Sequence, residues 1–171
     1  MGDGIMIAKL ATFTALHTAL SLVALVSGII VVIGLIGSKP LPMWNAIFLA
    51  TAFATSATGL GFPATALLPA HAIGAVSLVV LASAMLAYYG FHLSGAWRSI
   101  YAIGVVVSLY FDVFVAIVQA FKHVPALTAL APTASEPPFE VAQGVALVIF
   151  VVLAVWAAIR FHPGALMPSS H

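Results

Sequence analysis

The stretch Trp97–Lys122, WRSIYAIGVVVSLYFDVFVAIVQAFK, decides the fold, because it is apolar and long enough to cross a bilayer yet carries Asp112 near its middle. At about 100° per residue along a helix, Asp112, Gln119 and His123 fall within about 20° of one line. Ser108 lies one turn before Asp112 on the same side, and Tyr101 and Arg98 continue the stripe towards the start of the helix. A helix formed by this stretch therefore carries a polar seam, made of Ser108, Asp112, Gln119 and His123, along one face.

A carboxylate in the hydrocarbon core of a membrane costs roughly 3 kcal/mol on insertion scales, so Asp112 is expected to face the interior of a helix bundle or a water-filled cavity. We expect the other helices to close around the polar seam. Two interpretations of the carboxyl group stay open. It belongs to a proton or ion pathway with Gln119 and Ser108, or it makes a structural hydrogen bond to the Thr and Ser residues of the stretch 44–62.

The composition identifies an integral membrane protein. Hydrophobic residues make up 64% of the 171 residues and charged residues only 5%, whereas about a quarter of the residues of a soluble domain are charged. The lipid bilayer is therefore an expected partner. The net charge of +1 provides no basic arm, so no nucleic-acid partner is expected. The absence of Cys excludes thiol chemistry and Cys-ligated metals.

Five apolar stretches separated by Gly and Pro breaks predict an all-α, polytopic membrane helix bundle. The bundle forms a single transmembrane domain over residues 1–171. The predicted spans cover residues of about 10–36, 44–62, 70–89, 97–122 and 139–161. Aromatic and basic side chains near the span ends are interpreted as anchors in the membrane–water interface. These anchors are Trp44, Tyr88, Tyr89, Arg98 and Tyr101.

An odd number of spans places the two termini on opposite sides of the membrane. We call the N-terminal side face A and the other side face B. Short segments on face B carry three basic residues and those on face A carry two, which favours face B as the cytoplasmic side and a periplasmic N-terminus. The basic residues are Lys39, Arg98 and Arg160 on face B, and Lys9 and Lys122 on face A.

The longest connection, residues 124–138, reads VPALTALAPTASEPP and contains four prolines. The prolines predict that it is not helical throughout. Its apolar side chains indicate that it lies on the membrane surface or folds over the face A end of the bundle. A connection of this length in a compact protein is more often functional than not.

Three histidines from three different spans, His17, His71 and His123, converge near face A. His17 and His71 are candidate axial ligands of a haem b, because haem iron takes its ligands from facing helices. Small residues near the two ligand faces, among them Gly28 and Gly74, would leave room for a flat macrocycle. The alternative is that each imidazole simply hydrogen-bonds a neighbouring helix.

A metal or proton site is a second interpretation of the histidines. Neutral imidazoles from His17, His71 and His123, together with the Asp112 carboxylate, suit zinc, nickel or iron. Against this interpretation, no two histidines with metal-ligand spacing lie on one predicted helix.

The stretch Val118–Gln143, VQAFKHVPALTALAPTASEPPFEVAQ, resembles a family of uncharacterised small bacterial inner-membrane proteins in which a loop of the form VPAL…LAP…SEPPF…Q joins the last two spans. TSATGLGFP at Thr55–Pro63 and LPAHAIGAVSL at Leu68–Leu78 extend the resemblance over most of the chain after Trp44. It implies a multi-pass protein of the bacterial inner membrane and no particular activity. LHTALSLVALVSGIIVVIG at Leu16–Gly34 is similar to the first His-bearing helix of cytochrome b561-type membrane proteins, which implies haem b.

Three classes of function stay open. The leading hypothesis is a small b-type-cytochrome-like protein for electron transfer or haem handling, with His17 and His71 as ligands. The second is a proton-coupled carrier of a small solute or ion that uses Asp112, Gln119 and His123. The third is a non-catalytic accessory subunit, working in a homo-oligomer or in a larger membrane complex. Whether the protein is an enzyme also stays open.

Overall fold

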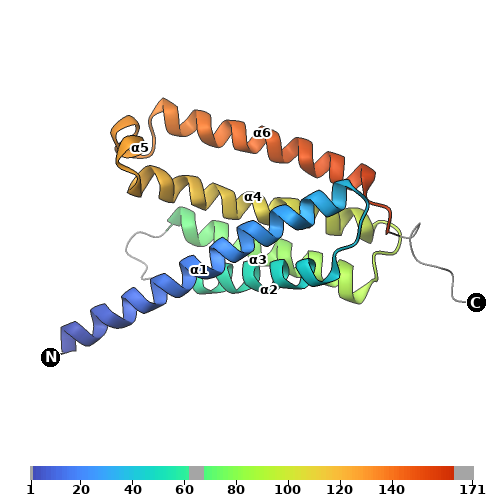
Figure 1. The fold of residues 1–171 in the computed structure, drawn as a ribbon, viewed down its shortest axis with the longest axis horizontal. Coiled ribbons are helices and arrows are strands. Elements are labelled where there is room, and N and C mark those ends of the chain that lie inside the picture. The colour runs from blue at the N-terminus through green and yellow to red at the C-terminus, as the bar shows by residue number, and fades with distance from the viewer. Residues whose placement is uncertain (1, 62–67, 164–171) are drawn as a thin grey trace, which may run out of the picture.

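The structure, a computed structural model, describes residues 2–61 and 68–163 (Figure 1). Every regular element in those ranges is helical, which confirms the predicted all-α class. α3 continues directly into a short π-helix, η2. In chain order the elements are α1 (Gly2–Ile36), α2 (Pro42–Gly59), α3 (Leu68–Met85), η2 (Leu86–Gly90), α4 (Trp97–His123), α5 (Pro125–Leu130) and α6 (Pro137–Arg160).

Four stretches of the described helices are long and apolar enough to cross a membrane: Ala8–Ile36, His71–Gly90, Trp97–His123 and Pro137–Arg160. This finding fits a multi-pass membrane protein. α2, which was predicted as a further span, is not among them. Its 18 residues include an Asn and four Thr or Ser hydroxyl groups, which lower its apolar character. The predicted end of that span at residue 62 lies outside the described residues.

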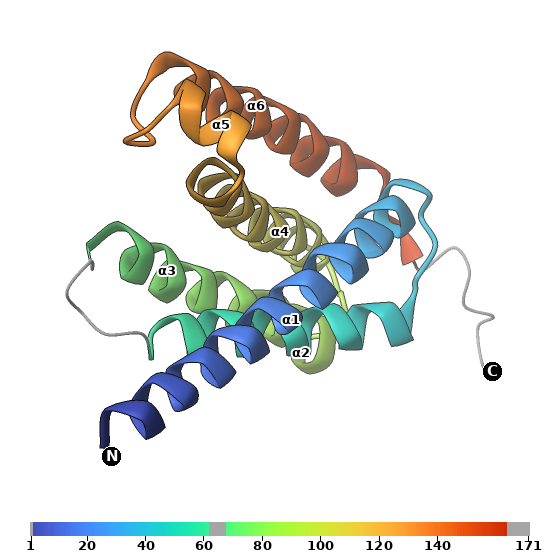
Figure 2. The ribbon, with the colours of Figure 1, turned by 60° about the vertical axis from the view of Figure 1, so that its left-hand side comes forward.

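Four helices begin before the predicted spans, α1 by eight residues and α2, α3 and α6 by two residues each. α6 begins at Pro137, because Pro137 and Pro138 occupy its first turn, where the missing N–H groups of proline leave no helical hydrogen bond unmade. α1 begins at Gly2 and has 35 residues. At 1.5 Å per residue it is about 52 Å long, well beyond the ~30 Å of a bilayer core. Its N-terminal turns run past the other helices (Figure 2).

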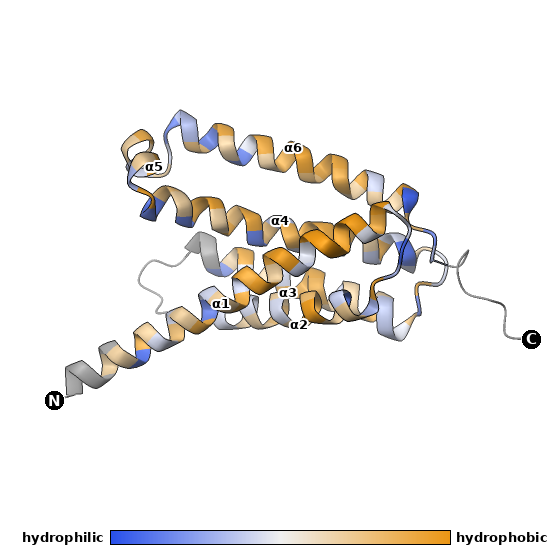
Figure 3. Cartoon of the chain, in the orientation of Figure 1, coloured by the Kyte–Doolittle hydropathy of each residue, from blue (hydrophilic) through white to orange (hydrophobic). Residues whose placement is uncertain are grey.

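α4 lies at the centre of the bundle and packs against α1, α3, α5 and α6. α1 and α3 both pack on α2, and within the described chain they make no comparable contact with each other. α6 is held mainly by α4, and its outward face is apolar and exposed. Apolar residues run along most of each helix, and hydrophilic residues gather mainly near the helix ends and connections (Figure 3).

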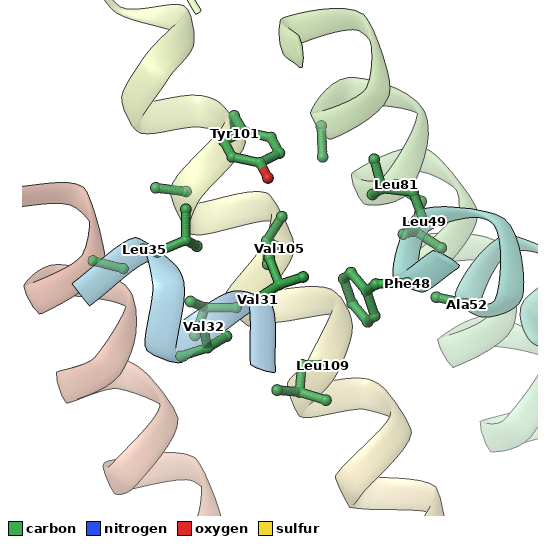
Figure 4. Close-up of a cluster of buried hydrophobic side chains, with 14 of the residues drawn as sticks. Val31, Val32, Leu35, Phe48, Leu49, Ala52, Leu81, Tyr101, Val105 and Leu109 are labelled. Carbon is green, nitrogen blue, oxygen red and sulfur yellow. The ribbon is translucent and has the colours of Figure 1, made fainter. Parts of the chain in front are cut away.

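The main hydrophobic core lies where α1, α2, α3 and α4 meet, in the half of the bundle nearer face B (Figure 4). Its large side chains come from all four helices and interdigitate, so this half is dry. They include Val31, Val32, Leu35, Phe48, Leu49, Leu81, Val105 and Leu109.

Candidate functional site

α1, α2 and α4 are held in register at Gly28 of α1. A methyl group added at Gly28 would lie 2.7 Å from Leu109 Cδ1 on α4 and 2.8 Å from Phe48 Cε2 on α2, so both side chains would have to shift to accommodate it. On the three helices, the residues about one turn nearer to face A are Ala24, Ala52 and Asp112. Both alanines are fully buried. At the depth of Asp112, α1 and α2 therefore contribute methyl groups rather than polar partners.

The Asp112 carboxyl group has a buried oxygen, Oδ2, with no hydrogen-bond partner among the described residues. Ser108, one turn away on the same face, is 1% exposed, and its Oγ is likewise without a partner. The predicted structural hydrogen bond from Asp112 to the hydroxyl groups of α2 is therefore not seen for this oxygen. Buried polar atoms in proteins are nearly always satisfied, so two such atoms one turn apart call for an explanation by function, water or an ion.

A second contact sets the register of α3 on α4. A methyl group at Gly104 of α4 would lie 3.1 Å from Ala84 Cβ and 3.6 Å from the Val80 carbonyl oxygen of α3. The two helices are antiparallel (Figure 1). One turn nearer to face A than the Gly104 contact, Ser108 on α4 is therefore level with Ser77 on α3. The interior at this depth is thus lined by hydroxyl groups.

α2 reaches the same level. The buried Ser56 hydroxyl of α2 donates a hydrogen bond to Ser77 Oγ at 3.0 Å. Thr55, next to Ser56 in the chain, is 8% exposed, and its Oγ1 has no partner in the described chain. We call Thr55, Ser56, Ser77 and Ser108, four buried hydroxyl residues from three helices, the hydroxyl layer; in the described chain a hydrogen bond joins Ser56 to Ser77 only.

The packing loosens at Asp112. On α4 most residues from 101 to 109 are buried, whereas no residue from 110 to 120 is. The described side chains of residues 8–23 on α1 and 71–76 on α3 show the same change, since none of them is buried. Asp112 thus lies where the tightly packed half of the bundle gives way to a half with fewer buried side chains towards face A.

The polar seam follows this gradient. Ser108 is buried and Asp112 is half-buried, whereas Gln119 and His123 are exposed. Helix geometry keeps all four on one face of α4. The predicted seam therefore leads from the buried hydroxyl layer to the surface at face A, and it does not extend through the core towards face B.

His17 lies in α1 towards face A, as predicted, and its ring bonds a neighbouring helix. The Thr58 hydroxyl donates to the Ala54 carbonyl oxygen at 2.7 Å, so it accepts the hydrogen bond from His17 Nδ1 at 2.9 Å. Nδ1 then carries the proton and Nε2 is the unprotonated nitrogen. The alternative interpretation of His17, a hydrogen bond to a neighbouring helix, is confirmed.

The small residues that would leave room for a haem are used for helix packing instead. Gly28 faces α2 and α4, as described above, and a methyl group at Gly74 would lie 3.3 Å from Leu60 Cδ2, next to α2. Because α2 packs between α1 and α3, the described residues do not fit a macrocycle between His17 and His71. Haem ligation by this pair stays a prediction, which the visible spectrum of the purified protein checks.

The predicted metal site is not assembled in the described part of the chain. No three His, Cys, Asp or Glu side chains gather there into a group that could hold a metal ion. His71 is half-buried, with Nδ1 buried and unpartnered, whereas His123 is exposed at the end of α4. A metal site made of His17, His71 and His123 therefore has no support in this arrangement.

The prediction that Tyr101 is an interfacial anchor is wrong. Tyr101 is 2% exposed, and its hydroxyl group donates a 2.7 Å hydrogen bond to Asn45 Oδ1 on α2. The Tyr88 ring of η2 lies 5.1 Å from the Tyr101 ring. The sequence holds a signal for this contact, because Asn45 is the single Asn of the chain and lies in an apolar stretch.

The connection between α5 and α6 is ordered by Glu136. Its carboxylate accepts hydrogen bonds from the Thr133 hydroxyl at 2.8 Å and from the N–H groups of Thr133 and Ser135, both at 3.1 Å. Slight desolvation acts to raise the pKa of Glu136, but these hydrogen bonds outweigh it and lower the pKa below its usual value. This acid has a structural role at face A and lies outside the polar seam.

Comparison of the chain with models of protein families, with curated proteins and with solved structures finds no match. The functional argument therefore rests on the site itself.

Proposed function

We propose that the protein is a proton-coupled carrier of a small solute or ion, in which Asp112 takes up and releases the coupling proton. The observation that carries this proposal is the Asp112 Oδ2 atom, buried and unpartnered in a helix long enough to span a membrane. Ionisable residues inside membrane spans are costly, and they usually serve ion or proton pathways.

The arrangement around Asp112 supports a carrier over a purely structural acid. A structural carboxyl group would be expected to use both oxygens in hydrogen bonds. The exposed seam residues Gln119 and His123 offer a polar route from face A, while the hydrophobic core closes the route to face B. In the proposed carrier this route is open to face A and closed towards face B, which is one of the states that alternating access requires.

The membrane topology is part of the same proposal. α2 crosses the membrane as a fifth span, although it is less apolar than the others, because its polar side chains bond α1, α3 and α4 rather than facing lipid. The protein lies in the bacterial inner membrane, with face A and the N-terminus in the periplasm. The polar seam then opens to the periplasm, where a proton enters.

Proton movement in reconstituted vesicles tests the proposal. Purified protein is placed in vesicles that contain the pH-sensitive dye pyranine, and a pH gradient is imposed in a buffer with both sodium and potassium chloride. We expect the wild type to dissipate the gradient faster than empty vesicles. Asp112→Asn, which cannot be deprotonated, should fall to the rate of empty vesicles while it keeps its helical circular dichroism.

Glu140→Gln is the matched control, since it replaces a carboxyl group by an amide on α6, away from the seam. It should keep the wild-type rate. Equal rates for the wild type and Asp112→Asn would reject the carrier. An accessory subunit would instead tolerate Asp112→Asn and purify together with a partner protein.

A further inference from the structure

We propose that Lys39, Arg98 and Arg160 form a binding site for the headgroup of an anionic phospholipid at the face B end of the bundle. The sequence holds four acidic residues, and all of them lie elsewhere. Asp112 is in the middle of α4, and the others lie towards face A: Asp3, Glu136 and Glu140. The three cations at face B therefore have no acidic residue of the chain beside them as a counter-ion.

A hydrogen bond joins the two segments that carry Lys39 and Arg160. The backbone N–H of His162, just after α6, donates to Ser38 Oγ, in the link between α1 and α2, at 2.9 Å. Ser38 adjoins Lys39 in the chain, and Arg160 ends α6 two residues before His162. Both charged side chains are exposed. Two cations that are far apart in the sequence are thus carried by backbone segments that meet at the surface.

The start of α4 packs against the same segments. Phe161 directly follows Arg160, and its ring centroid lies 5.7 Å from that of Tyr101 on α4. Arg98 lies one turn before Tyr101 on the same helix. The link after α1, the start of α4 and the end of α6 all lie at one end of the bundle (Figure 1). All three cations are therefore presented at this end.

Arg98 also has a hydrogen-bond donor without an acceptor. Its side chain is half-buried, and its Nε atom is buried with no partner in the described chain. Buried polar atoms nearly always have a partner, so this atom indicates a missing acceptor. The planar guanidinium group matches the paired oxygens of a carboxylate or a phosphate. Because no acidic residue lies at this end, a phosphate is the acceptor that remains.

The tryptophans of the chain place this end at the depth of lipid headgroups. Trp97 directly precedes Arg98, Trp156 lies one turn before Arg160, and Trp44 lies in the first turn of α2. Tryptophan is enriched where a membrane meets water, with its ring at the level of the headgroups. The cations beside these rings therefore lie where the phosphates of the bilayer are.

The charge of the cations selects the class of lipid. Basic pockets at the ends of membrane helices bind anionic headgroups. A phosphatidylglycerol headgroup brings a negative charge with no positive charge of its own. A phosphatidylcholine headgroup also brings a quaternary ammonium group, which three cations repel. An anionic phospholipid is therefore the expected ligand.

Quenching of tryptophan fluorescence by brominated lipids tests the site, because all three tryptophans report on lipids near face B. The protein is reconstituted in phosphatidylcholine vesicles that contain rising fractions of brominated phosphatidylglycerol or brominated phosphatidylcholine. We expect a binding constant for phosphatidylglycerol that is about threefold or more that for phosphatidylcholine. The double variant Lys39→Gln/Arg160→Gln, which changes exposed positions only, should bring this ratio close to one. Arg98→Lys keeps the charge without the planar fork and should give an intermediate ratio.

Lys9→Gln/Lys122→Gln is the matched control, since it removes two exposed cations at face A. It should keep the wild-type ratio, and circular dichroism should show the same helix content in every variant. The site is overturned by a wild-type ratio near one, by an unchanged ratio in the face B double variant, or by an equal loss in the control. An excess of inorganic phosphate should leave the ratio unchanged. If phosphate abolishes the ratio, the site binds a free anion and the lipid assignment is wrong.

Discussion

The hydrogen bond from the Tyr101 hydroxyl to Asn45 ties α4 to α2 in the dry half of the bundle. Both residues are almost fully buried, at 2% and 1% exposed. The Asn45 Nδ2 atom is buried and has no hydrogen-bond acceptor among the described residues. Apart from Tyr88, whose side chain also bonds Asn45, the surrounding side chains are apolar, so water is not expected to replace a partner lost from this pair.

Tyr101→Phe is therefore expected to lower the free energy of unfolding by about 1–3 kcal/mol, the cost of leaving a buried acceptor unpaired. Unfolding of the detergent-solubilised protein with sodium dodecyl sulfate, followed by circular dichroism, measures it. Tyr89→Phe is the control, since Tyr89 is 50% exposed on the adjacent π-helix, and it should unfold with the wild type. A midpoint unchanged by Tyr101→Phe would show that the hydrogen bond adds nothing to stability.

At the scale of the residue, helical periodicity in the sequence predicts which residues share one face of a helix. It places Ser108 and Asp112 on one face of one helix, and the structure buries an oxygen of each. It does not single out Thr55, because Thr55 and Thr51 are both threonines of the same apolar stretch. Only the tertiary structure shows that the Thr51 hydroxyl bonds its own helix and that Thr55 Oγ1 has no partner in the described chain.

At the scale of the element, the close packing of Gly28 on α1 against Phe48 on α2 and Leu109 on α4 arranges the helices. It allows α1, α2 and α4 to approach closely, and the approach sets Asp112 about level with Ala24 and Ala52. A side chain at this position would have to push two well-packed side chains aside, because a methyl group there would lie within 3 Å of both.

Gly28→Ala should destabilise the bundle by about 1–3 kcal/mol, as overpacking of a filled core does. Gly144→Ala on α6 makes the same substitution where no atom lies within 4 Å of the added methyl group. It should be neutral or raise stability by up to about 1 kcal/mol, the helix propensity difference between the two residues. The same sodium dodecyl sulfate titration compares the two variants. Equal destabilisation by both would mean that glycine at 28 serves no packing role.

At this scale the sequence predicts most helix boundaries, because Gly and Pro mark them. The sequence is a poorer guide where tertiary contacts, rather than local composition, decide the outcome. The helix Pro42–Gly59 forms as expected, but its hydroxyl groups and Asn45 make it less apolar than the other four, so hydropathy alone does not establish that it crosses a membrane. The haem hypothesis treated Gly28 and Gly74 as open space, because a sequence does not show which helix fills the groove beside a glycine.

For the whole molecule, the central property is the difference between its two halves. The hydrophobic core seals the half nearer face B, and the side chains towards face A are more open. The polar seam and the hydroxyl layer meet at this boundary. The direction in which the site opens, and therefore the side from which a proton or ion enters, depends on how the bundle is oriented and on whether α2 crosses the membrane.

Cysteine labelling decides both points, because the natural chain contains no Cys. Gly37→Cys, in the link between α1 and α2, and Ser94→Cys, in the link between η2 and α4, share a side of the membrane only if α2 crosses it. Ala129→Cys on α5 lies at face A.

With five spans and a periplasmic N-terminus, a membrane-impermeant maleimide added to intact cells should label Ala129→Cys, whereas Gly37→Cys and Ser94→Cys should react only after lysis. Labelling of Gly37→Cys and Ser94→Cys from opposite sides would remove α2 as a span. Labelling of both from outside, with Ala129→Cys protected, would keep five spans but turn the open half, and with it Asp112, towards the cytoplasm.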